Sequence, residues 1–208
     1  MALTLNGSTN TIAGVAVGGL PDGIVDADTL ATDSVQTAKI VADAVTAAKA
    51  TGGRSLLAAD EWRITSGFSS IDTYLTSNWE RIDGTAQGTL GTGMSQSSGV
   101  FTFPSLGIWS IRFQATCSST EGRRYVGINI DGTSNGGSSY AKMAENYGSV
   151  FDDSSGVYMS IVAHTIADVT SLSDIKVKFK VFASTSLDWE SSSATNVTYA
   201  TFTRLGDS

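Results

Sequence analysis

The sequence predicts an all-β protein, with an antiparallel sandwich or jelly roll over residues 62–208, preceded by an elongated repeat stalk or anchoring arm. Ser, Thr and Gly make up more than a third of the 208 residues, which is typical of strands joined by short polar turns. Every aromatic residue lies at or beyond Trp62. In this second part, several segments alternate apolar and polar residues with the period of a half-buried strand.

The first 53 residues form the predicted arm. They contain no aromatic residue and are rich in Ala, Thr, Gly and Asp, so they cannot bury enough apolar area to fold alone. Apolar residues nevertheless recur at every fifth position: Val15, Leu20, Val25, Leu30, Val35, Ile40 and Val45. A period of five fits neither a helix nor a strand, but it fits a short repeating unit that buries one residue per repeat against other copies of the chain.

Two other interpretations of the arm stay open. A helix over residues 34–49 would place apolar residues at coiled-coil spacing, namely Val35, Ala38, Ala42 and Val45. A flexible linker with accidental spacing is the third interpretation. The repeat and the helix both require association with other chains. Residues 54–61 are expected to link the arm to the head.

In the second part, six segments show this alternation of apolar and polar residues, and each is bounded by turn-forming residues. They are residues 100–104, 108–117, 125–130, 157–164, 175–181 and 196–205. One of them is predicted to bury Trp109, Ile111, Phe113, Ala115 and Cys117 on a single face. The third segment is expected to end at a turn formed by Asp131 and Gly132. Segments 157–164 and 196–205 are apolar on parts of both faces, as expected for central or interface strands.

Two polar stretches, residues 131–139 and 142–155, are predicted to be exposed loops suited to recognition. Further along the chain, Asp188 and Glu190 flank Trp189 and would share one side of a strand. That pattern could bind a sugar with an aromatic plate, or position two carboxylates for glycoside hydrolysis, and an acidic loop is the alternative. The candidate recognition surface comprises Asn135, Tyr140, Tyr147 and Trp189.

No catalytic, cofactor or metal site is expected, and the protein is not predicted to be an enzyme. His164, the one histidine, lies on a predicted strand without the Gly-x-Ser-x-Gly context of a serine hydrolase. Cys117 continues an apolar face and is expected to be a small core residue. The formal net charge of −7 disfavours nucleic acid, and no apolar run is long enough for membrane insertion.

The spacing of one set of residues resembles a known family: Gly99, Phe101, Pro104, Gly107, Trp109 and Phe113. Together they resemble the Gly-x-Phe-x-x-Pro-x-x-Gly-x-Tyr-x-x-x-Phe run in the opening strands of C1q/TNF-like trimeric jelly rolls, with Trp in place of the usual Tyr. Residues 199–206 are similar to the last strand of that family, which closes near the trimer axis. The resemblance covers residues 62–208 and implies a homotrimer.

The repeats of the arm, such as residues 43–49, resemble the stalks of tail fibres and related virion proteins of tailed bacteriophages. Ahead of a C1q-like head, they imply a homotrimeric virion protein that is assembled in the host cytoplasm. Its partners would be other virion proteins, of the tail or the capsid, and a host-surface glycan or protein. Leu3, Leu5 and Ile12 are then candidate virion anchors.

The position on the particle stays open at this point. A tail fibre is the first interpretation, and a head fibre or a capsid decoration or cement trimer that stabilises the shell is the alternative. A polysaccharide-degrading fibre enzyme is the least favoured.

Overall fold

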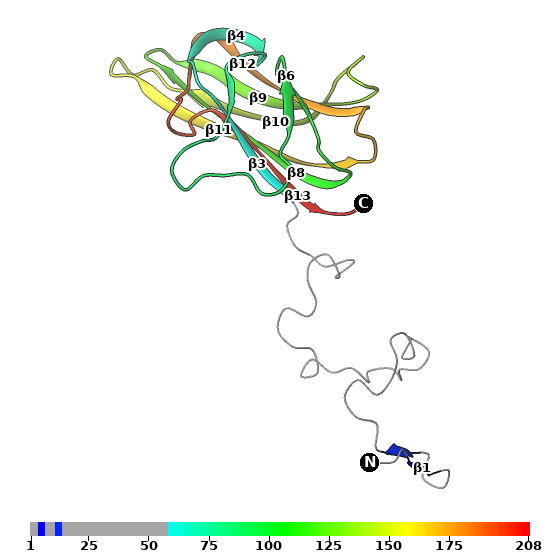
Figure 1. Ribbon diagram of the computed structural model, residues 1–208. Helices are drawn as coiled ribbons and strands as arrows, with labels where there is room; N and C mark the ends of the chain where they lie inside the picture. Colours follow the sequence, from blue (N-terminus) through cyan, green and yellow to red (C-terminus); the bar gives the residue numbers. More distant parts are fainter. Residues whose placement is uncertain (1–3, 7–10, 14–57) are drawn as a thin grey trace. The chain divides into compact units, whose positions relative to one another are not determined.

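The computed structural model describes residues 4–6, 11–13 and 58–208 (Figure 1). The chain divides into two units, residues 1–53 and residues 54–208. In the first unit, β1 (Thr4–Asn6) pairs antiparallel with β2 (Thr11–Ala13), and Leu5 is the register partner of Ile12. Leu3, the seven positions of the five-residue repeat and the alternative helix all lie outside the described residues.

The second unit, here called the head, contains eleven strands in one curled sheet. They are β3 (Ala58–Ile64), β4 (Phe68–Tyr74), β5 (Trp79–Arg81), β6 (Ser95–Ser97), β7 (Val100–Thr102), β8 (Gly107–Ser119), β9 (Arg123–Ser134), β10 (Ala141–Val150), β11 (Val157–Val169), β12 (Ile175–Glu190) and β13 (Tyr199–Gly206). The described residues include no helix long and apolar enough to cross a membrane. The predicted all-β antiparallel class is confirmed.

The head has two layers. The β8 layer has the order β11-β8-β13-β3-β5, and every pair in it is antiparallel. The β9 layer has the order β10-β9-β12, with β4 and β7 on the other side of β12 and β6 beyond β7. Such a pair of layers buries the inward half of each alternating strand between them.

Strand β12 joins the two layers. Residues 175–183 pair with β9, whereas residues 188–190 pair with residues 116–118 of β8. The register against β4 shifts between Phe182 and Leu187, and a bulge of this kind bends a strand. The bend allows one strand to leave one layer and close one end of the head against the other.

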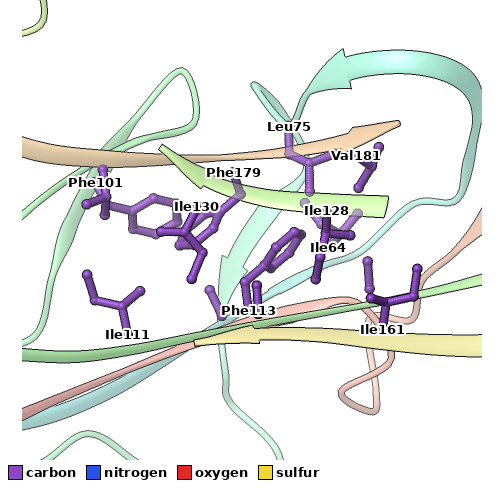
Figure 2. Close-up of a cluster of buried hydrophobic side chains, with 14 of the residues drawn as sticks. Ile64, Leu75, Phe101, Ile111, Phe113, Ile128, Ile130, Ile161, Phe179 and Val181 are labelled. Atoms are coloured by element: carbon purple, nitrogen blue, oxygen red, sulfur yellow. The ribbon is translucent and has the colours of Figure 1, made fainter. Parts of the chain in front are cut away.

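Aromatic side chains fill the space between the layers. Phe179 of β12 meets Phe113 of β8 with ring centroids 4.8 Å apart, and it meets Phe101 of β7 at 5.4 Å. Figure 2 shows these rings between strands of both layers, with Ile111 and Ile130 beside them. The predicted inward face of β8 is confirmed, because its five residues, from Trp109 to Cys117, have no exposed surface.

Three predictions of element boundaries were wrong. Strand β9 does not end at Asp131 and Gly132 but continues to Ser134, because residues 131–134 pair with residues 175–178 of β12. Residues 142–150 are not a loop but most of β10, an exposed strand at the sheet edge. Residues 58–61, expected in the linker, belong to β3 and pair with β13.

A buried carboxylate organises the part of the head that sequence patterns did not resolve. Asp60 of β3 accepts hydrogen bonds from Arg81 Nε of β5 at 3.0 Å, from the indole of Trp62 at 2.9 Å and from the amide of Met94 at 2.7 Å. The Arg81 guanidinium also forms an ion pair with it. Buried charge is tolerated when it is paired and hydrogen-bonded in this way, so Asp60 fixes the long β5–β6 connection onto the head.

Candidate functional site

The structure does not bring the candidate recognition residues together. Asn135 and Tyr140 lie in the β9–β10 connection, at the end of the head where β12 begins. Tyr147 is exposed in β10, where its ring packs against Phe182. Trp189 is only 1% exposed and belongs to the core, so its expected place on a recognition surface was wrong. Its indole N–H points to the carbonyl of Ser70.

The two carboxylates beside Trp189 share the opposite side of β12, as alternation requires. Asp188 accepts a hydrogen bond from the Ser69 hydroxyl, and Glu190 accepts one from the Ser118 hydroxyl. Because the tryptophan between them faces the core, it cannot act as an aromatic plate for a sugar held by these carboxylates. Asp188 itself remains exposed at the end of the head.

Around Asp188 the head carries a cavity of about 500 Å³, here called the end pocket. Its walls come from the start of β4, the β8–β9 turn, the β10–β11 loop and the bulge of β12. The lining residues are Ser69, Ser118, Ser119, Thr120, Glu121, Arg123, Ser155, Gly156, Tyr158, Ser186, Leu187 and Asp188. The lining is thus mostly hydroxyl groups with three charged side chains.

Arg123 forms the fixed cationic wall of the end pocket. Its side chain is only 10% exposed, and its guanidinium donates to Glu121 Oε2 and to the carbonyl of Ser186, both at 3.1 Å. Among the described residues, the buried Nε atom has no hydrogen-bond partner. Several simultaneous hydrogen bonds hold a guanidinium plane in one orientation, so this wall is preorganised.

The outward face of the β8 layer is the second candidate surface. On β11, Val162, His164 and Ile166 point away from the core, and on β13 Leu205 is exposed. Ile166 also lines a shallow groove of about 270 Å³ with Met143 of β10, at the open edge between the layers. Val162, Ile166 and Leu205, here called the apolar band, alternate on this face with polar side chains of β8 and β13, and the described residues leave Ile166 and Leu205 exposed.

Polar groups on the same face are hydrogen-bonded to one another, within a strand and between neighbouring strands. Arg112 Nη1 donates to the Tyr199 hydroxyl at 2.7 Å, and its Nη2 donates to Gln114 at 2.8 Å. Glu61 of β3 accepts from Thr201 at 2.9 Å. Paired polar groups cost less to bury than unpaired ones, so this face can be covered by another protein surface at low desolvation cost.

His164 lies 2.8 Å from the Ser110 hydroxyl through its Nε2 atom. The pair sits on the outward face of a central strand, and Ser110 is paired on both sides, with Ile166 of β11 and Thr203 of β13. Backbone N–H groups here are used by the sheet, whereas an oxyanion hole needs free donors beside the nucleophile. The arrangement is that of a surface hydrogen bond. Within the described residues, no cluster of His, Cys, Asp or Glu side chains could hold a metal ion.

The arrangement of strands in the head is also found in solved structures of other proteins. The chain is similar to Eiger TNF from S. frugiperda with a TM-score of 0.54 and 8% sequence identity, over 74% of this chain and 96% of that one. It is similar to murine APRIL at pH 5.0 with a TM-score of 0.50 and 14% identity, over 71% of this chain and 98% of that one. The head has a TNF-like jelly-roll fold. No protein-family model matches the sequence, and no curated protein matches it either.

The end pocket contains residues that sequence reasoning missed. Neither Tyr158, which is 73% exposed, nor Arg123 was among the candidate residues. The alternation of segment 157–164 does place Tyr158 on the side away from the core, which was the available signal. What the sequence could not show is that the β8–β9 turn, the β10–β11 loop and the β12 bulge meet at one end.

Proposed function

We propose that the protein is a non-enzymatic structural component of a bacteriophage virion, a homotrimeric fibre-type protein with an anchoring N-terminal arm and a jelly-roll head for host-surface attachment. The observation that carries the trimer is the apolar band on the outward face of the β8 layer, from Val162 and Ile166 to Leu205. Burial of such a band in self-association removes apolar area from water and supplies the arm with partners.

The electrostatics of this face support a second copy of the chain as its partner. The Arg112 guanidinium is bonded only to neutral groups, Tyr199 and Gln114, and forms no ion pair within the described residues. The chain has a net charge of −7, so a second copy offers many carboxylates for such a cation. One exposed candidate is Asp168 on the same face.

The viral part of the proposal is supported by the resemblance of the arm repeats to phage fibre stalks. A trimer carries three arms, so three weak contacts between the arms and the particle can form at once. Their combined affinity is then much higher than that of one contact. The virion is the proposed location. The partners are tail proteins at the arm and a surface molecule of the host at the head.

Light scattering of the purified full-length protein tests the trimer. We expect a mass of three 21.6 kDa chains, independent of protein concentration in the micromolar range. A monomer at all concentrations would remove the assembly on which the proposal depends.

A truncation tests the anchor. Deletion of residues 1–20, which include Leu5 and Ile12, should leave a folded head that no longer joins phage particles. On particles that carry the full-length protein, immunogold labelling of that protein should mark the tail. Normal incorporation of the truncated protein contradicts the anchoring role, and uniform labelling of the shell contradicts the fibre in favour of a decoration protein.

A further inference from the structure

The end pocket lies at the end of the head opposite to the point where the chain enters it. Ala58, the first residue of β3, is opposite Arg204 of β13, which in turn is opposite Trp109 of β8. The pocket begins at Ser118 of the same strand, nine residues further along, which corresponds to about 30 Å. A ligand in this pocket is therefore bound away from the chain entry.

From these residues we infer that the end pocket is a binding site for a neutral saccharide of the host surface. The geometric argument concerns the head alone, and its biological use rests on the function proposed above. The cavity volume of about 500 Å³ falls within the range of about 300–1,000 Å³ that is usual for small-ligand sites.

The charges in the pocket exclude anionic ligands. The Arg123 cation is already paired with Glu121 at 3.1 Å, so it is not free to receive a carboxylate or phosphate. Asp188 adds a second carboxylate to the lining, and Glu190, two residues further along the same side of β12, is bonded to Ser118. An anionic sugar would meet uncompensated negative charge, whereas the hydroxyl groups of a neutral sugar can donate to it.

The end pocket offers hydrogen-bond acceptors and donors for the hydroxyl groups of a sugar. Asp188 binds the Ser69 hydroxyl through Oδ1, and its Oδ2 atom forms no hydrogen bond within the described part of the chain. Glu121 likewise uses Oε2 for Arg123 and leaves Oε1 for a ligand. The hydroxyls of the lining can donate or accept, so they adapt to either hydrogen-bond role of a sugar hydroxyl.

Tyr158 supplies an apolar surface on the rim. Tyr158 is 73% exposed at the end of β11 nearest the pocket, and Gly156, two residues before it, lines the pocket with a positive φ of 88°. An exposed aromatic ring beside carboxylates can cover the C–H face of a pyranose ring while the polar edge of the sugar bonds to the carboxylates. Trp189 was expected to have this role and is buried. Tyr158, 31 positions earlier in the chain, is in position to perform it.

Saturation-transfer NMR on the full-length protein tests the inference. The probes are glucose, galactose, mannose and N-acetylglucosamine, with glucuronic and galacturonic acid as anionic counterparts. We expect transfer to at least one neutral sugar and none to the acids. The substitutions Tyr158→Ala and Asp188→Asn should each weaken that binding by about tenfold or more, because each removes a specific contact. Tyr147→Ala, at an exposed tyrosine outside the pocket, should leave the affinity unchanged.

Several outcomes would overturn the inference. They are no transfer to any neutral sugar at tens of millimolar, binding only of the acids, or wild-type affinity in both pocket variants. Loss of binding in Tyr147→Ala instead would move recognition to β10. A monomeric protein that binds sugar through Tyr158 and Asp188 keeps the site and rejects the trimer, while a trimer without binding does the reverse.

Discussion

Asp131 and Cys117 are two buried residues of this head that are each hydrogen-bonded to a residue of another strand. Asp131 of β9 accepts a hydrogen bond of 2.6 Å from the Tyr74 hydroxyl of β4, and its other carboxylate oxygen is buried with no partner in the part of the chain that the structure describes. Cys117 donates weakly to the carbonyl of Met159 in the neighbouring strand. These environments raise the pKa of Tyr74 and of Cys117, and the consequences of both shifts can be measured.

Tyr74 should make the stability of the head depend on alkaline pH. Burial, and then the hydrogen bond to Asp131, raise the pKa of Tyr74 from 10.0 to about 12. Because the folded state holds the Tyr74 proton more tightly than the unfolded state does, Tyr74 contributes its full stabilisation below pH 10. This contribution is lost as the pH rises through 12. We expect Tyr74→Phe to be less stable than wild type by about 1–3 kcal/mol at pH 8, since Asp131 loses its donor. The gap should narrow between pH 10 and 12 in urea unfolding, and a gap that stays constant would contradict this coupling.

Cys117 should be chemically inert in the folded protein. Burial raises the pKa of its thiol to about 11, so the reactive thiolate is scarce at neutral pH. Iodoacetamide at pH 8 should leave the native protein unmodified over hours and label it rapidly in concentrated guanidinium. Fast labelling of the native protein, followed by mass spectrometry, would show that the end of β8 opens readily.

At the scale of elements, short turns with special backbone conformations set the register of the strands. The β6–β7 hairpin turns through Ser98 and Gly99, which both have positive φ, of 49° and 76°. Two successive positive φ values are the signature of the hairpin turn whose twist matches that of paired strands. A Cβ at Gly99 would lie 2.0 Å from the carbonyl oxygen of Leu75, so only glycine fits the site.

Gly99→Ala should therefore destabilise the head by about 2 kcal/mol or more, because it adds both an unfavourable φ and a backbone clash. Gly88→Ala is the matched control, since a Cβ there meets nothing within 4 Å. Thermal unfolding should show a clear drop in Tm for the first variant only. Equal Tm values in both would mean that the turn can rearrange at little cost.

At the scale of the whole molecule, the head separates its surfaces by position. The chain enters at the Ala58 end, the end pocket lies at the other, and the apolar band runs along the outward face of the β8 layer between them. Side chains on the β9 layer instead form a mixed cover, with Lys178 over the ring of Tyr74 at 3.7 Å and over Tyr140 at 3.9 Å. Ile71 and Met143 are exposed on this layer too, and the outward face of the β8 layer is the one proposed for assembly.

Ile166→Asp tests this division. A carboxylate in the middle of a buried apolar contact loses its hydration, so we expect the variant to sediment as a folded monomer while wild type remains a trimer. Ile71→Asp changes an equally exposed isoleucine on β4 of the other layer and should remain trimeric. If both variants stay trimeric, the outward face of the β8 layer is not the subunit contact.

The strands that face water on one side could be predicted from the sequence, because their alternation records which face is buried. That holds for β8 and for the first half of β12. Strand β10 was missed since it lies at a sheet edge and carries polar residues on both faces, so it has no alternation to detect. The same reason applies to β4, whose residues are exposed or half-buried throughout.

By itself, the sequence determined the all-β class and the buried face of β8, because these depend on local periodicity along the chain. Only the tertiary structure decided the candidate site. Tyr158, Arg123 and Asp188 come from three separate strands, and they meet because β12 bends at its bulge and crosses from one layer to the other. The buried position of Trp189 follows from the same closure, since its side of the strand turns into the core where the layers join.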